Sequence, residues 1–187
     1  MKLSWSDLCA LLENAGSRLY GGEAISQLEH ALQSAHFAQQ AGGDTHAICA
    51  ALLHDIGHIV AEQRDDDLAN GMNDQHEALA IPLLKPLFGE AICAPIALHV
   101  AAKRYLCAIE ADYYANLSPA SQASLQLQGG VMTPEEVARF AANPYAEAAV
   151  FLRRCDDQAK IPQFVTPPSA YFLDLPATLC KPNQASI

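Results

Sequence analysis

The sequence predicts an all-α protein, folded as a single helical bundle around one core. Apolar residues recur at helical spacing along most of the 187-residue chain, and no segment shows the strict alternation of a half-buried strand. Helix-start signals support this assignment, because Ser118 and Thr133 each stand as N-cap candidates directly before a Pro. A chain of this length can bury a substantial core within one domain.

The first half of the chain is expected to hold four helices. A flexible joint with paired Gly, residues 20–23, separates the first two. Ser26 and Glu29 form a predicted capping box that opens the second. Residues 64–73 are polar and predict a solvated loop before the fourth. The first three predicted helices span about residues 5–15, 26–41 and 44–54, and Gly16 ends the first. The fourth begins at residue 73 or 74 and contains His76, and Pro82 and Pro86 kink or divide it.

The second half of the chain is expected to be helical up to about residue 160. Predicted helices cover about residues 90–108, 119–127, 134–141 and 144–160. From residue 161 on, five Pro in 27 residues and the absence of periodicity predict an extended tail over the surface. We therefore expect a bundle over residues 1–162, which includes the N-terminal joint, and an irregular tail over residues 163–187.

The composition disfavours several classes of protein. A net charge of −10 argues against a general nucleic-acid binder, whose basic surface must meet phosphates. A small anionic substrate remains compatible, since a buried Lys and metal cations can reverse the local charge. No apolar run looks long enough to span a bilayer, and the N-terminus lacks the pattern of a signal peptide. We expect a soluble, cytoplasmic protein with neither nucleic-acid nor membrane partners, and no particular oligomeric state is predicted.

The six Cys residues of the chain are expected to be reduced thiols. None forms a C-x-x-C pair, and several lie in apolar helical runs, where a free Cys behaves as a small hydrophobic residue. Disulfides are rare in the cytoplasm. The Cys residues therefore predict neither a disulfide framework nor a thiolate metal site.

The most informative motif is the segment from Leu53 to His58, which contains an adjacent His-Asp pair, His54 and Asp55. It closes an apolar run and carries a second imidazole, His58, four residues after the first. Neighbouring helical side chains point about 100° apart, so the pair could grip one metal or bracket two. Imidazole with carboxylate suits zinc, iron, manganese and similar ions. The motif therefore predicts a metal site.

Four His residues strengthen this prediction, because each falls in a different predicted helix among apolar neighbours. They are His30, His54, His76 and His99. One such His is usually a core or boundary residue, but helical bundles build metal sites from ligands that project inward from facing helices. The set of four therefore favours metal binding. His36 and His46 lack this pattern, and we interpret both as structural.

A further carboxylate ligand is expected from the last predicted helix of the bundle. Asp156 and Asp157 lie there beside an apolar face, and the residues alone leave open which of the two faces the metal. A surface ion pair with Arg153 and Arg154 is the alternative.

Lys103 stands four residues after His99, so both project from one face of a helix. A cation beside a metal is unfavourable unless an anion bridges them, and a phosphate or phosphonate group would do so. The alternative is that Lys103 extends to solvent. The spacing alone favours neither interpretation.

The order of these residues resembles a known superfamily. His30, His54-Asp55 and a distant Asp resemble the HD domain, an all-helical fold of metal-dependent phosphohydrolases. The likeness extends further, to the HD-domain oxygenases of phosphonate breakdown, with inositol oxygenase as a more distant relative. It covers residues 15–162 and is carried by Tyr20-Gly21-Gly22-Glu23, Gln27 to Ala31, Leu52 to His58, His76-Glu77, Leu98 to Leu106, Leu117 to Ser121, and Arg153 to Lys160.

The resemblance implies a mixed-valent di-iron centre, Fe(II)/Fe(III), with Asp55 as the bridge between the irons. It implies that a small α-hydroxyphosphonate chelates one iron while dioxygen reacts at the other. Cleavage of the carbon–phosphorus bond would release phosphate and a carboxylic acid, and 2-amino-1-hydroxyethylphosphonate, giving glycine, fits best. The positions that match the family's metal ligands are His30, His54, Asp55, His76, His99 and Asp156.

The resemblance also implies roles in substrate binding and catalysis. Lys103 and Ser121 match positions that hold the phosphonate, and His58 matches a His that contacts substrate or supports a ligand. His58 joins His54 and Asp55 as the implied catalytic group. Tyr20 and Glu23 match a lid, in which Tyr occupies an iron site without substrate and Glu meets the ammonium of the substrate. A mobile segment of this kind suits a gate that excludes water.

Two other functions remain open from the sequence. An HD-type phosphohydrolase would act on a nucleotide or a small phosphate ester with the same ligand types, although it would not need the lid. A non-catalytic metal-binding partner of another enzyme is the third reading, and the complete ligand set argues against it.

Overall fold

The computed structural model describes residues 3–15, 17, 19–20, 23–60 and 75–181. These residues form helices and no strand, apart from an isolated antiparallel bridge between Leu19 and Ser26. The all-α prediction is confirmed. The helices are α1 (Trp5–Ala15), α2 (Gln27–Gln40), α3 (Thr45–Leu53), α4 (Ile56–Val60), α5 (His76–Leu84), α6 (Glu90–Ile109), α7 (Tyr113–Asn116), α8 (Pro119–Leu127), α9 (Pro134–Ala141), α10 (Ala146–Gln158) and α11 (Ser169–Ala177).

Capping side chains begin α2, α3, α8 and α9 where the sequence predicts these helices to begin. The Ser26 hydroxyl accepts the Glu29 backbone N–H at 3.2 Å, and Glu29 Oε2 accepts the Ser26 N–H at 2.7 Å, which completes the capping box of α2. Asp44 caps α3 by accepting the N–H of Ala47 at 2.9 Å. α8 and α9 have the predicted bounds. Gly16, the paired Gly21 and Gly22, and the loop 64–73 lie outside the described residues.

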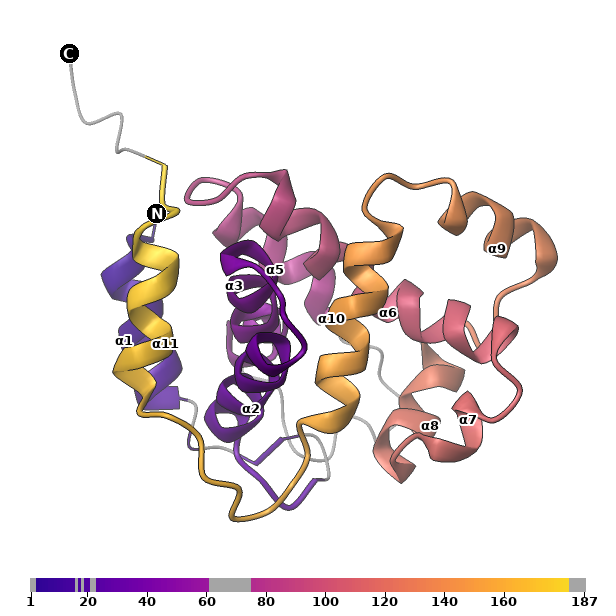
Figure 1. Cartoon of the computed structure of the whole chain (residues 1–187), viewed down its shortest axis with the longest axis horizontal. Coiled ribbons are helices and arrows are strands. Elements are labelled where there is room, and N and C mark those ends of the chain that lie inside the picture. Colours follow the sequence, from indigo (N-terminus) through magenta and orange to yellow (C-terminus); the bar gives the residue numbers. More distant parts are fainter. Residues whose placement is uncertain (1–2, 16, 18, 21–22, 61–74, 182–187) are drawn as a thin grey trace.

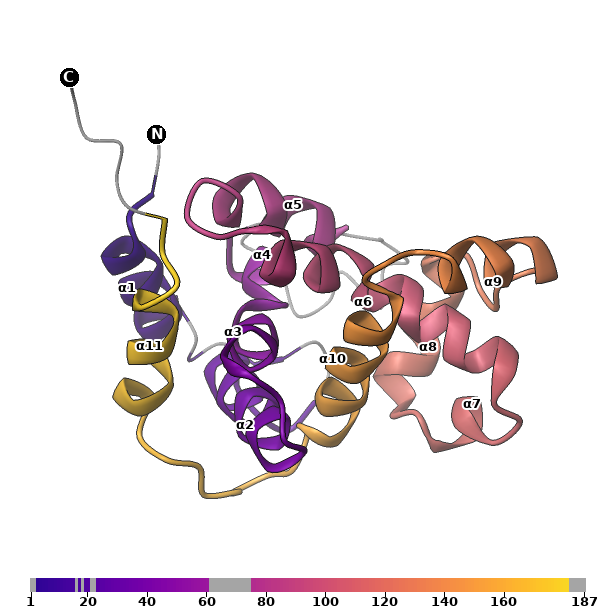
Figure 2. The same ribbon diagram turned by 45° about the horizontal axis from the view of Figure 1, so that its top comes forward.

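The bundle is organised around α6 and α10, which pack against each other (Figures 1 and 2). α6 also contacts α3 and α5, while α10 also contacts α2 and α3. One large apolar cluster fills the space among α1, α2, α3, α5, α6 and α11, with Phe88 and Phe172 among its largest buried side chains. A smaller cluster, which includes Ala102, Phe140 and Ala149, joins α9 and α10 to the outer half of α6.

The expected extended tail is wrong for residues 169–177, which form α11. Phe172 and Leu173 are buried in the main core, and α11 packs against α2 and α3. In both ribbon views α11 lies beside α1 (Figures 1 and 2). The Pro content misled the prediction, because Pro167 and Pro168 precede the first turn, where Pro is tolerated, and Pro176 falls at the last.

α6 also corrects the expectation about apolar runs. By length and composition alone, Glu90–Ile109 could cross a membrane. In the bundle this helix packs against α3, α5, α7, α9 and α10, and it presents the polar side chains of His99 and Lys103 to the interior. We therefore interpret α6 as the core helix of a soluble protein.

Candidate metal centre

Six buried side chains converge where α2, α3, α5, α6 and α10 meet. Each comes from a segment that the sequence analysis singled out, and none of them exposes more than 6% of its surface. Asp55 and the C-cap residue of α3, His54, occupy the short break between α3 and α4. The converging residues are His30, His54, Asp55, His76, His99 and Asp156.

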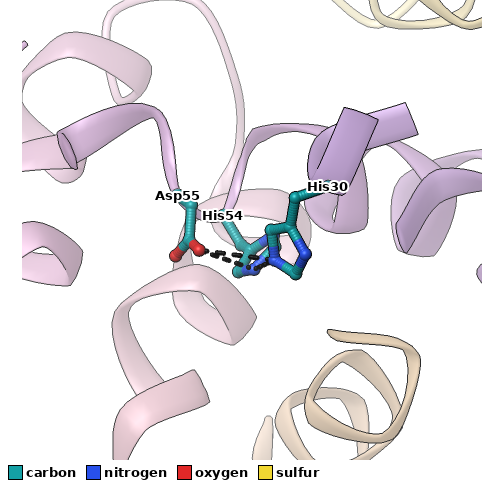
Figure 3. A group of neighbouring side chains, drawn as sticks. All are labelled: His30, His54 and Asp55. Carbon is teal, nitrogen blue, oxygen red and sulfur yellow. Dashed lines mark hydrogen bonds and ion pairs between the residues drawn. The ribbon is translucent and has the colours of Figure 1, made fainter. Parts of the chain in front are cut away.

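The first group of possible ligands consists of His30, His54 and Asp55, which point toward one another (Figure 3). The Nε2 atoms of the two His residues lie 3.2 Å apart. Asp55 Oδ2 lies 3.5 Å from His30 Nε2 and 3.2 Å from His54 Nε2. Asp156 Oδ1 approaches His30 Nε2 at 3.3 Å from α10. Three or four nitrogen and oxygen ligand atoms that converge on one point can coordinate a transition metal.

A second group uses the other oxygen of the same carboxylate. His76 Nε2 and His99 Nε2 lie 3.0 Å apart, and Asp55 Oδ1 lies 3.3 Å and 3.5 Å from them. Asp55 therefore stands between the two groups, with Oδ2 facing one and Oδ1 the other. Such a carboxylate can bridge two metal ions.

Hydrogen bonds hold three of the imidazoles in the tautomer whose Nε2 carries the lone pair when the ring is neutral. The Nδ1 atoms of His30, His54 and His99 lie 2.7–2.8 Å from the backbone carbonyls of Ala159, Ala51 and Ile96. A carbonyl only accepts, so each of these Nδ1 atoms carries a proton, and in the neutral ring each Nε2 presents a lone pair. In the first group two such lone pairs face each other at 3.2 Å. This contact is unfavourable unless a cation lies between the nitrogens, so the residues fit a bound metal.

The surroundings of Asp55 are a second indication that these residues fit a bound metal. Within the described residues no hydrogen bond of ordinary geometry reaches either of its buried oxygens, although four imidazole nitrogens lie 3.2–3.5 Å away. Burial alone would raise its pKa, but His54 and His58 outweigh burial and hold it well below the usual value. The Asp55 carboxylate is therefore a buried anion, which a positively charged partner would stabilise.

Asp156 and Asp157 contact different partners, and Asp156 is the one that approaches the imidazoles. Asp156 is 1% exposed and faces the imidazoles, with Oδ2 2.7 Å from Arg153 Nη1 and Oδ1 2.9 Å from Lys160 Nζ. Asp157 instead accepts from Tyr113 and Arg153. The pKa of Asp156 is well below its usual value because these two cations outweigh the effect of burial. The alternative ion pair forms with Arg153, which is buried and contacts both Asp156 and Asp157, whereas Arg154 pairs with Glu110 instead.

Lys103 is buried, so the interpretation in which it extends to solvent is wrong. It is 2% exposed, and its Nζ donates to Ser124 Oγ at 2.7 Å. Burial and the nearby Arg153 lower the pKa of Lys103 to about 7. Ser121 is buried one turn before Ser124 and lies 3.4 Å from Arg153 Nη2. A buried patch of cationic and hydroxyl donors suits an anion such as phosphonate.

Tyr20 and His58 cover the two halves of the cluster. The Tyr20 ring stacks on His30 with centroids 3.9 Å apart, and the His58 ring stacks on His76 at 3.8 Å. Burial, then the charges of Asp55 and Asp156, raise the pKa of Tyr20 well above its usual value, so its phenol stays protonated. One carboxylate oxygen of Glu23 is buried with no hydrogen-bond partner among the described residues.

Three polar residues at this site were missed or misinterpreted in the sequence. Ser124 follows Ser121 by three positions, and Lys160 follows Asp156 by four, so helical spacing could have indicated both. Arg153 was considered only for a surface pair, yet it is 4% exposed and contacts Asp156 directly. No local pattern distinguishes a buried Arg from an exposed one.

Comparison with known proteins places this geometry in a family. The HD-domain family matches residues 28–139, which include five of the six converging side chains and Lys103. This chain belongs to the HD-domain family. Its relatives include hydroxymethylphosphonate dioxygenase of Gimesia maris, 48% identical over 83% of this chain and 78% of that protein. They also include the glycine-betaine-forming [1-hydroxy-2-(trimethylamino)ethyl]phosphonate dioxygenase of Leisingera caerulea, 38% identical over 87% of this chain and 83% of that protein. Within the HD-domain family, the chain therefore groups with the phosphonate dioxygenases.

Proposed function

We propose that this protein is a di-iron dioxygenase that cleaves the carbon–phosphorus bond of a small α-hydroxyphosphonate in the cytoplasm. The observation that carries the proposal is the pair of His-Asp groups that share Asp55, with buried Lys103 beside them. A two-metal site in a phosphohydrolase would also use His and Asp ligands. The names of the relatives favour the oxidative reaction.

The metal ligands divide into two sets around Asp55. We assign His30, His54 and Asp156 to one iron and His76 and His99 to the other, with Asp55 bridging. When bound, a mixed-valent Fe(II)/Fe(III) pair would supply one-electron chemistry toward dioxygen. The carbonyls that bind Nδ1 of His30, His54 and His99 would leave Nε2 of these rings as the ligand atom, and both carboxylates are held ionised.

The anionic end of the substrate is proposed to bind at Lys103 and Ser121. Lys103 is charged in the complex, because a phosphonate placed beside it raises its affinity for a proton. Arg153 already neutralises Asp156, so it limits the repulsion between that carboxylate and the incoming phosphonate. The arrangement orients the hydroxyl-bearing carbon toward the metal cluster.

Glu23 and Tyr20 are proposed to act as a lid. The buried carboxylate oxygen of Glu23 that lacks a partner would accept a hydrogen bond from the ammonium of the substrate. The Tyr20 ring, stacked on His30, would leave when substrate enters and would otherwise keep water from the site. His58 would contact the substrate from the opposite side, since it lies 3.9 Å from Asp55.

The best substrate on this assignment is 2-amino-1-hydroxyethylphosphonate, which with one dioxygen gives glycine and phosphate. Hydroxymethylphosphonate is the second candidate, and the Gimesia maris relative supports it. The two differ in the ammonium group that Glu23 would meet. We expect Glu23→Ala to reduce kcat/KM for the amino substrate by roughly tenfold, the size of one charge-assisted hydrogen bond, and to leave hydroxymethylphosphonate turnover nearly unchanged. Equal losses on both substrates would remove the ammonium role of Glu23.

The reaction type is tested with iron-loaded protein and each hydroxyphosphonate, in air and under strict anaerobiosis. We expect one phosphate released for each dioxygen consumed and no release without dioxygen. Release that continues without dioxygen would contradict the proposal. Phosphate release from simple phosphate esters by the same preparation would indicate the hydrolytic alternative.

A further inference from the structure

We propose that Gly57 is a positioning residue for the second metal, because only a residue without a side chain lets His76 reach Asp55. The inference rests on the proposed two-metal site. Gly57 lies in α4, two residues after Asp55, and it faces the first residue of α5. The two helices pack together, and His76 is brought to the cluster through this contact.

The space at Gly57 is occupied by the backbone of His76. A Cβ atom at residue 57 would lie 2.0 Å from the His76 carbonyl oxygen, 2.7 Å from its carbonyl carbon and 3.0 Å from its Cα. All three are backbone atoms, which cannot rotate away as the end of a long side chain can. Any larger residue therefore forces α4 and the start of α5 apart.

The required movement is large compared with the tolerance of a metal site. The His76 oxygen would have to move from 2.0 Å to at least 3.0 Å from the new Cβ, a shift of about 1 Å. Metal–ligand distances are kept within about 0.2 Å of their preferred values. One further contact holds this residue in place, since the His76 ring stacks on His58. A displaced His76 would no longer reach the metal.

The effect should be confined to one of the two metals. The ligands assigned to the first iron come from α2, from the end of α3 and from α10. Asp55 contacts both groups through different oxygens, so Oδ2 can still serve the first group after Oδ1 has lost one partner. Gly57→Ala should therefore convert a two-metal protein into a one-metal protein.

The experiment is an anaerobic titration of the metal-free full-length protein with Co(II), followed by visible absorption and by metal analysis after gel filtration. We expect two ions per chain for the wild type, one for Gly57→Ala, and one for His76→Ala as the reference. After loading with iron, we expect both variants to lose the electron paramagnetic resonance signal of a coupled Fe(II)/Fe(III) pair. A merely structural role for Gly57 would not remove one ion selectively.

Two other glycines provide matched controls. Gly43→Ala also meets backbone, with its Cβ 2.8 Å from the Ala38 oxygen, but it lies in the α2–α3 turn away from the cluster. Gly89→Ala has nothing within 4 Å of its Cβ. Both should retain two ions, and Gly43→Ala shows what a comparable clash does elsewhere.

The outcomes separate the inference from the proposed function. A wild type that binds one ion would contradict the two-metal site itself. Gly57→Ala with two ions, or with none, would contradict the positioning role while leaving the wild-type site intact. All titrations include an excluded osmolyte at low temperature, which favours the folded state. Failure of Gly57→Ala to give helical circular dichroism there, while Gly43→Ala does, would also overturn the inference, because Gly57 would then serve the fold rather than the metal.

Discussion

The Nδ1 hydrogen bonds of His30, His54 and His99 determine the chemistry of the site at the scale of single residues. Each backbone carbonyl selects one tautomer, so the Nε2 lone pairs are aimed at one another and at Asp55. Burial lowers the proton affinity of His54, but Asp55 and Asp156 outweigh burial and raise its pKa. Burial and then His76 hold the pKa of His99 well below its usual value. His99 is therefore neutral and offers its Nε2 lone pair to a cation.

The first residue-scale prediction separates Asp156 from Asp157. Asp156→Asn should lose at least one bound metal, because its carboxylate faces His30, whereas Asp157→Asn should keep both. Asp156→Asn should also destabilise the metal-free protein by about 3 kcal/mol, since it leaves buried Arg153 and Lys160 without their shared anion. Metal analysis and urea unfolding measure the two effects. Full metal content in Asp156→Asn would mean that Asp156 is not a ligand.

A second residue-scale prediction concerns the pH dependence of substrate capture. The pKa of Lys103 is lowered to about 7, so in the free enzyme its ammonium is present below this pH and is lost above it. Because kcat/KM reports ionisations of the free enzyme, we expect it to fall as pH rises through about 7 for a phosphonate substrate. Lys103→Ala should lower kcat/KM, retain metal and lack this limb. The same limb in the variant would assign the ionisation to another group.

At the scale of elements, the helices divide into those that carry ligands and those that hold them in place. α2, α5, α6 and α10 each bring one proposed ligand, and the end of α3 brings two. α11 brings none but covers α2 and α3 with Phe172. The C-terminal helix is therefore part of the core that fixes the relative position of ligand-bearing helices.

The prediction at this scale is that α11 contributes stability rather than chemistry. Phe172→Ala should lower the free energy of unfolding by about 3–5 kcal/mol, the usual cost of removing a fully buried Phe. Tyr171→Ala is the matched control. The Tyr171 side chain adjoins Phe172 in sequence but is 47% exposed, so its removal should lower the free energy of unfolding far less. Urea unfolding of both variants gives the comparison. Similar losses for the two would contradict the packing assigned to α11.

At the scale of the whole molecule, the metal ions should stabilise the fold that creates their site. The cluster places two carboxylates and four imidazoles in a buried volume, and their lone pairs repel unless cations are bound. Ligand binding to the folded state alone adds about 4 kcal/mol when the free ligand is a thousandfold above its Kd.

We therefore expect removal of metal by a chelator to lower Tm, and Fe(II) added without oxygen to restore it. Scanning calorimetry measures the shift, and a His30→Ala variant serves as the control because it should respond much less. An unchanged Tm after complete removal of the metal would show that metal binding does not stabilise the fold, contrary to this prediction.

Local patterns determined much of this protein from its sequence. The capping box of Ser26 and the Pro residues after Ser118 and Thr133 predicted helix starts correctly, because caps are interactions within a few residues. The spacing of four His in four helices and the His54-Asp55 pair also predicted which side chains would gather. Residue type and helical period are enough to place such groups on inward faces.

The tertiary structure decided what depends on how helices pack. It directs Asp156 rather than Asp157 to the imidazoles, buries Lys103, and folds residues 169–177 against α3. It also places Asp55 between two groups of ligands and brings the backbone of His76 against Gly57. These relations join residues that are distant in the chain, and their geometry is set by the packing of whole helices, which no local pattern records.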